Sequence, residues 1–162
     1  KHQNAYRQWY KLKRVFSILP NPNDYHYIIR IRPDLFLLET PESFLELLKS
    51  LQPNHLYLPD KFNIYDAKLQ TNKEGMNDQF AIADPDTMSV YSSTFLFLRW
   101  HATRGVSLCG HAMLEAQLQH FSIPVERIDI DHPFVDGKFN IGRHSLIRDD
   151  MSNWVDTKIW GY

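Results

Sequence analysis

The residues best placed for chemistry lie in Arg30-Ile31-Arg32-Pro33-Asp34, where an apolar run gives way to a turn. Alternation along a strand puts Arg30 and Arg32 on one face, and the fixed proline backbone shapes the turn that presents Asp34. Ligands of open α/β sheets bind at the carboxyl ends of strands, so we expect an anion and metal site here. Arginines together with a carboxylate-bound divalent cation can neutralise a diphosphate. An internal ion pair combined with a turn cap explains the same residues equally well.

A second polar motif, Asn77-Asp78-Gln79, follows Gly75-Met76 and leads into the apolar residues from Phe80 onward. A carboxylate flanked by two amides suits the binding of sugar hydroxyls, and the carboxylate can take a proton from one of them. Taken alone, the motif is also ordinary turn chemistry, because Asn and Asp after glycine favour turns.

A third candidate lies near the carboxyl end, where Asp129 and Asp131 precede His132, with His144 further along. His132 and His144 are the candidate histidine ligands for a metal. These four residues also fit a zinc or phosphoesterase-like site, although a dinuclear site needs further spaced ligands. A charged strand end is the alternative. The remaining histidines show no ligand spacing and are expected to be structural or on the surface: His2, His26, His55, His101, His111 and His120.

The elements that must position these residues follow from the apolar spacing and from helix and strand boundary signals. We expect a long surface loop over 60–77 and a helix-capping turn at Asp84-Pro85-Asp86. Because strands alternate with helices, the pattern predicts an α/β sandwich with a mainly parallel sheet. The helices are expected over 5–19, 41–51, 88–98 and 109–121, and the strands over 25–31, 55–58, 80–83 and 127–130.

Size and charge limit the remaining possibilities. The chain has 162 residues, of which 43% are hydrophobic, so we expect one domain spanning 1–162. The formal net charge of -1 predicts no general attraction to nucleic acid or anionic membrane, so any polyanion must be bound locally. The single cysteine, Cys109, is expected to be a small buried hydrophobe. No apolar run approaches the roughly 20 residues of a membrane span, and we expect a soluble, cytoplasmic protein.

Three segments together resemble the capsule-type glycosyltransferases of bacteria and viruses, which have a GT-A-like fold. They are Tyr-Lys-Leu-Lys-Arg-Val-Phe at 10–16, Tyr-His-Tyr-Ile-Ile-Arg-Ile-Arg-Pro-Asp-Leu at 25–35, and Asn-Asp-Gln-Phe-Ala-Ile at 77–82. Their order and spacing match those of the family, and the resemblance covers roughly residues 5 to 125. Such enzymes usually begin with a nucleotide-binding strand and helix ahead of the matched region. We therefore expect this chain to be a fragment that lacks its first strand-helix unit.

The resemblance implies roles for individual residues. Asp34 would stand at the end of the Asp-x-Asp-type element and contact a Mn²⁺ or Mg²⁺ ion and the donor diphosphate. The first position of that element is Arg32 here, and arginine can supply part of the cation's charge. Asp78 would be the acceptor-side carboxylate and the catalytic base of an inverting enzyme. A late histidine, His132 or His144, would complete the metal site.

The sequence therefore predicts a hexosyl- or deoxyhexosyltransferase of polysaccharide biosynthesis, acting on a nucleoside diphosphate sugar and a carbohydrate acceptor. Arg30, Arg32 and Asp34 would bind the donor diphosphate, Asp78 would be the base, and Asn77 and Gln79 would bind the acceptor. Two alternatives stay open. One is a metal-dependent phosphoesterase, and the other is a non-catalytic carbohydrate-binding or assembly module derived from a transferase.

Overall fold

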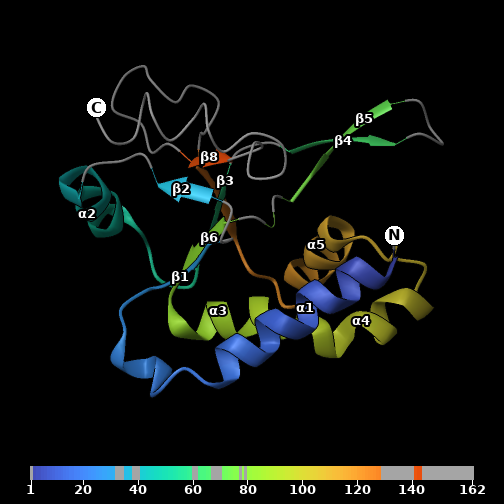
Figure 1. Cartoon of the computed structure of the whole chain (residues 1–162), viewed down its shortest axis with the longest axis horizontal. Helices are drawn as coiled ribbons and strands as arrows, with labels where there is room; N and C mark the ends of the chain where they lie inside the picture. The colour runs from blue at the N-terminus through green and yellow to red at the C-terminus, as the bar shows by residue number, and fades with distance from the viewer. Residues whose placement is uncertain are drawn as a thin grey trace, which may run out of the picture.

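The computed structural model describes residues 2–31, 35–37, 41–59, 62–66, 71–76, 78, 80–128 and 141–143. Figure 1 shows the helices and strands of these residues. The helices are α1 (His2–Ser17), the short 3-10 helix η1 (Pro22–Asp24), α2 (Pro41–Ser50), α3 (Pro85–Ser92), α4 (Thr94–Thr103) and α5 (Gly110–His120). The strands are β1 (Ile28–Ile31), β2 (Leu35–Leu37), β3 (Leu56–Pro59), β4 (Phe62–Asp66), β5 (Thr71–Gly75), β6 (Phe80–Ala83), β7 (Val125–Ile128) and β8 (Ile141–Arg143).

The central sheet has four strands in the order β1-β6-β3-β7. Strand β6 runs antiparallel to both β1 and β3, whereas β3 and β7 are parallel. The expectation of a mainly parallel sheet is therefore wrong, and the protein is a mixed α/β fold. A parallel neighbour requires a crossover connection, but β6 follows the β4–β5 hairpin instead of a crossover helix. Strands β1, β3 and β7 nevertheless point the same way, because each of β1 and β3 opposes β6.

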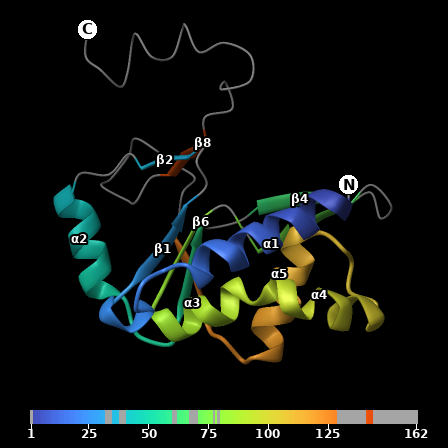
Figure 2. The same cartoon turned by 60° about the horizontal axis from the view of Figure 1, so that its bottom comes forward.

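Helices cover both faces of this sheet. The cluster on one face joins Leu56, Leu58, Ala81 and Ala83 of the strands to α1, α3, α4 and α5. On the other face, Tyr57, Phe80 and Ile82 pack against Phe44, Leu47 and Leu48 of α2. Figure 2 shows α2 on the opposite side of the sheet from the other four helices. Strand β6 is buried on both faces, which explains its uninterrupted apolar sequence.

Helix α1 is attached to the larger cluster through Trp9, which is completely buried. The Trp9 ring meets the Tyr91 ring of α3 edge to face, with centroids 5.5 Å apart. Both side chains lie in the cluster with Met88, Met113 and Leu114. These contacts fix the position of α1 beside the sheet, and α1 in turn carries one wall of the groove described below.

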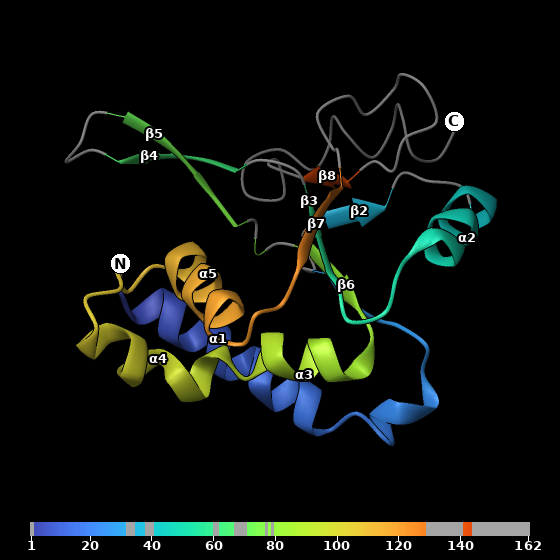
Figure 3. The same ribbon diagram turned by 180° about the vertical axis from the view of Figure 1, so that it is seen from behind.

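Besides strand direction, the sequence missed strands β2 and β8 and misjudged three further features, although it located most of the elements. The stretch expected to be a surface loop contains the antiparallel β4–β5 hairpin, which Figure 3 shows extending away from the sheet. Its strand Thr71–Gly75 has no apolar alternation, so periodicity could not reveal it. The helix expected over 88–98 is two helices, α3 and α4, separated at Ser93. Cys109 is half-buried at the position before α5, not fully buried.

Candidate functional site

Asp78 lies where the carboxyl ends of several strands meet. It precedes β6, which is antiparallel to β1 and β3, so the start of β6 shares an edge of the sheet with the ends of those strands. In the register of β1 and β6, Ile31 lies opposite Phe80 and Arg30 opposite Ala81. The strand pairing thus brings Arg30 and Asp78, one residue from each motif, together at the sheet edge where α/β proteins bind ligands.

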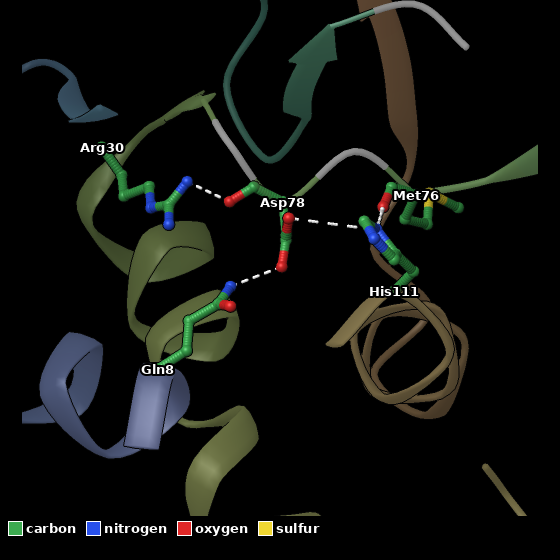
Figure 4. Close-up of polar contacts among 5 residues, drawn as sticks. All are labelled: Gln8, Arg30, Met76, Asp78 and His111. Atoms are coloured by element: carbon green, nitrogen blue, oxygen red, sulfur yellow. Dashed lines mark hydrogen bonds and ion pairs between the residues drawn. The ribbon is translucent and has the colours of Figure 1, made fainter. Parts of the chain in front are cut away.

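The Asp78 residue is held by side chains from three elements, which Figure 4 shows together. Gln8 of α1 donates a hydrogen bond from its amide nitrogen to the Asp78 carboxylate. Arg30 of β1 donates from its guanidinium to the main-chain carbonyl of Asp78. The second carboxylate oxygen lies 3.9 Å from Nδ1 of His111, in the first turn of α5. Only 6% of Asp78 is exposed, so this residue is a buried junction between α1, β1 and α5.

Glycine at position 110 allows α5 to begin against this carboxylate. A Cβ atom built on Gly110 would lie 2.8 Å from Oδ2 of Asp78, which is closer than real Cβ contacts. The amino-terminal end of a helix carries partial positive charge from its unpaired N–H groups. A carboxylate beside that end is electrostatically favourable, so the close approach of α5 to Asp78 is a favourable contact.

His111 extends the polar contacts of the site, and sequence reasoning missed it. Its Nδ1 lies 2.6 Å from the main-chain carbonyl of Met76, an acceptor, so Nδ1 carries the proton and donates. Arg127 of β7 lies over the same residue, with a guanidinium nitrogen 3.3 Å from the Met76 sulfur. No metal-ligand or catalytic spacing marks His111 in the sequence. His111 reaches Asp78 and Met76 because α5 begins beside the edge of the sheet that carries Asp78.

Tyr91 is completely buried close to Arg30 and Asp78. Burial raises the pKa of Tyr91 to about 12, while the charge of Arg30 opposes the rise and that of Asp78 adds to it. Within the described residues, neither the Tyr91 hydroxyl nor the Trp9 ring nitrogen has a hydrogen-bond partner. A buried hydroxyl without a partner costs free energy, and Tyr91 carries this cost close to Arg30 and Asp78.

A groove of about 740 Å³ opens between α1 and β1 in front of this cluster. Three cationic side chains line it, Arg7 and Lys11 from α1 and Arg30 from β1. Gln8 also lines the groove, whereas Asp78 does not, so Gln8 and Arg30 separate the carboxylate from the opening. Ser92 and eight apolar side chains make up the rest of the lining, the apolar ones being Leu12, Val15, Phe16, Leu19, Ile28, Ile29, Ile31 and Met88. This arrangement suits an anion that also carries an apolar or ring portion.

The structure brings together two of the residues selected from the sequence, Arg30 and Asp78. Arg7, Gln8 and Lys11 of α1 also belong to the site. In the sequence, only the cationic residues of that helix could have indicated that it contributes. The other selected residues lie outside the part of the chain that the structure describes: Arg32, Asp34, Asn77, Gln79, Asp129, Asp131, His132 and His144.

The described residues do not supply a complete metal site. Mn²⁺ and Mg²⁺ require several oxygen ligands, and the Asp78 carboxylate faces the Gln8 amide, the His111 ring and the start of α5. Within the described ranges no three His, Cys, Asp or Glu residues converge as a metal-binding group. Asp78 therefore does not fit as the ligand of a divalent cation. Metal binding by Asp34 stays a prediction.

Comparisons with known proteins add no relative to this description. No family model, curated protein or solved structure matches the chain. Among the helices of the described residues, none is sufficiently long and apolar to cross a membrane.

Proposed function

We propose that this protein transfers a sugar from a nucleoside diphosphate sugar to a hydroxyl of a carbohydrate acceptor. The observation that carries the proposal is the contact between Arg30 and the main chain of Asp78. It joins the motif that the sequence suggests for the donor diphosphate to the motif suggested for the acceptor. The two motifs are 48 residues apart in sequence, and a transferase needs its donor and acceptor sites to be adjacent.

The groove supports the donor half of the proposal. Arg7, Lys11 and Arg30 can surround a diphosphate with positive charge, and charge-assisted hydrogen bonds to phosphate oxygens are stronger than neutral ones. The apolar lining offers surface for the base or the sugar ring. In the proposal Arg32 and Asp34 extend this site, and a Mn²⁺ or Mg²⁺ ion held by Asp34, with His132 or His144, supplies further charge to the diphosphate.

Asp78 supplies the acceptor half. Its carboxylate would take the proton from the acceptor hydroxyl as that oxygen attacks the sugar carbon, with Asn77 and Gln79 binding neighbouring hydroxyls. The Gln8 amide is hydrogen-bonded to the carboxylate and also lines the groove. An acceptor must therefore displace this amide to reach the carboxylate. In this proposal Gln8 lies between the donor groove and the Asp78 carboxylate until the acceptor binds.

The donor site is tested by calorimetric titration of uridine, guanosine and thymidine diphosphates, with and without Mn²⁺. We expect one of them to bind, and Lys11→Ala to weaken its binding about threefold to fivefold, as for loss of one exposed ion pair. Lys49→Ala is the matched control, because Lys49 lies on α2 and pairs there with Glu46. Equal affinity in the two variants, or no binding by the parent protein, would contradict the donor site.

The acceptor role is tested by Asp78→Asn, which keeps the side-chain volume and removes the base. We expect transfer from the bound nucleotide sugar to fall at least about 100-fold. The free energy of unfolding should change by less than about 2 kcal/mol, because the amide can still accept the Gln8 hydrogen bond. Product formation is measured beside urea unfolding of the same preparation. Unchanged turnover would exclude Asp78 as the base.

One observation favours the non-catalytic alternative, a carbohydrate-binding or assembly module. Asp78 is almost fully buried and does not line the groove, as expected for a structural carboxylate. This alternative predicts that Asp78→Asn lowers stability while carbohydrate binding remains, and that no nucleoside diphosphate binds. The residues of the phosphoesterase alternative lie outside the described ranges, and nothing in the described part supports it.

A further inference from the structure

Helix α1 has an exposed side that the core does not explain and of which the proposed site uses only Arg7, Lys11 and Val15. Its residues recur at helical spacing along one stripe: Tyr6, Arg7, Tyr10, Lys11, Arg14, Val15 and, just beyond the helix, Ile18. All seven are exposed. The opposite side of the helix packs into the core through Trp9, Leu12 and Phe16. The stripe overlaps the groove at Arg7, Lys11 and Val15 and extends beyond it, and we call it the α1 face.

The α1 face combines strong exposure with apolar character. The exposed fractions are 72% for Ile18, 59% for Val15, 57% for Tyr6 and 47% for Tyr10. Such side chains usually occur singly on a protein surface, and a row of them at regular spacing marks an interaction site. Tyr6 and Tyr10 each rest edge to face on Phe95 of α4, with ring centroids 5.0 and 5.2 Å away. Their rings are thus held in place before any partner binds.

The charge of α1 has one sign. The helix contains Arg7, Lys11, Lys13 and Arg14 and no aspartate or glutamate, although the whole chain has a net charge of -1. A local positive surface of this kind attracts anions even when the overall charge does not. The cations of the α1 face alternate with its tyrosines and aliphatic residues. A partner must therefore offer negative charge and an apolar environment close together, no further apart than the length of a side chain.

We infer that the α1 face docks the protein on the surface of an anionic lipid bilayer. Basic amphipathic helices lie in the headgroup region, where lysine and arginine meet anionic lipids and the apolar side chains reach the acyl boundary. Tyrosine rings are favoured at the same depth. Nucleic acid would satisfy the cations through its phosphates but leaves Val15 and Ile18 without an apolar environment. The inference does not depend on the proposed transfer reaction.

The test uses two variants outside the proposed donor groove, Arg14→Gln and Ile18→Ser. Neither residue lines that groove, and both are exposed, so the fold and nucleotide binding should be unaffected. Lys49→Gln is the matched control, because Lys49 is an exposed cation on α2, which packs on the opposite face of the sheet from α1. Each protein is sedimented with vesicles of phosphatidylcholine alone and with vesicles that also contain phosphatidylglycerol.

We expect the parent protein to bind the phosphatidylglycerol vesicles and to be released by salt. Arg14→Gln should lower the partition coefficient about fivefold, the effect of one cation at an anionic surface. Ile18→Ser should lower it about tenfold through lost apolar burial, and Lys49→Gln should leave it unchanged.

Three results would overturn the inference: equal binding to both vesicle types, equal loss in all three variants, or binding to duplex DNA or polyglutamate as strong as to the vesicles. Self-association of the parent protein in light scattering, abolished by Ile18→Ser, would also overturn it, because the face would then join two copies of the chain.

Discussion

Asp78 joins helices α1 and α5 to strand β1. Its carboxylate contacts Gln8 and lies against Gly110, and its main chain accepts a hydrogen bond from Arg30. A carboxylate in this position has a structural role whether or not it also takes a proton. Variants of Asp78 must therefore be measured for stability and activity together.

At the residue scale, Gly110→Ala tests how closely α5 approaches Asp78. Alanine in place of glycine within a helix normally stabilises a protein, by about 0.5–1 kcal/mol. Here the added methyl would meet the Asp78 oxygen at 2.8 Å, and burial and the Gln8 hydrogen bond restrict the escape of that side chain. We expect a net loss of about 1–3 kcal/mol in the free energy of unfolding, measured with urea.

A double-mutant cycle supplies the control. In an Asp78→Ala background the carboxylate is absent, so Gly110→Ala should no longer destabilise the protein. If the cost of Gly110→Ala is the same in both backgrounds, the close approach is not its cause.

At the scale of elements, α3 begins with a cap that the sequence predicted at Asp84-Pro85-Asp86. The Asp84 carboxylate accepts hydrogen bonds from the Thr87 amide at 2.9 Å and the Thr87 hydroxyl at 2.8 Å. It also accepts one from the Asn54 amide at 2.6 Å, which ties the start of α3 to the turn before β3. The expected capping turn is confirmed, with Asp84 as the capping residue.

Removing this cap should have a pH-dependent effect. Asp84→Ala should cost about 1–2 kcal/mol in the free energy of unfolding at neutral pH. Partial burial by itself would raise the pKa of Asp84, but the hydrogen bonds from Thr87 and Asn54 outweigh it and hold the pKa below its ordinary value. The stabilisation is therefore complete above the unfolded pKa of about 3.9 and is lost as pH falls through the folded pKa.

The measurement is urea unfolding of the parent and Asp84→Ala between neutral pH and pH 3. Their difference should stay constant down to about pH 5 and shrink below about pH 4. Asp84→Asn is the control, because asparagine caps helices well and does not titrate. A difference that persists unchanged in acid would show that the charge of Asp84 is not the stabilising feature.

At the scale of the whole molecule, one sheet separates two apolar clusters. The larger lies under α1, α3, α4 and α5, and the smaller lies under α2. Strand β6 belongs to both, since its alternate residues point to opposite faces. We therefore expect the two layers to unfold together.

Phe80→Ala tests this coupling, because Phe80 is fully buried in the smaller cluster. We expect a loss of about 3–5 kcal/mol. Tryptophan fluorescence, to which buried Trp9 of the larger cluster contributes, and circular dichroism should report the same lowered midpoint. Phe97→Ala is the comparison, because Phe97 is only half-buried and lies in a ring cluster with Trp100 and Phe121. Two separate transitions would mean that the α2 layer unfolds alone.

The sequence by itself determined the elements that carry strong local signals. Helices α1, α2 and α5 and strand β6 lie close to where apolar periodicity and boundary residues predicted them. Arg30 and Asp78 could also be selected, because charged residues at the ends of apolar strands are unusual. These features depend on neighbours in sequence, so a linear pattern contains the information.

Only the tertiary structure decided strand direction and the neighbours of Asp78. Alternation of helices and strands leaves direction open, and β6 opposes both of its neighbours because a hairpin precedes it. Gln8, Gly110 and His111 reach Asp78 from helices distant in sequence, since the packing of α1 and α5 against one end of the sheet brings them there. A contact between distant segments depends on how layers pack, and no spacing along the chain records it.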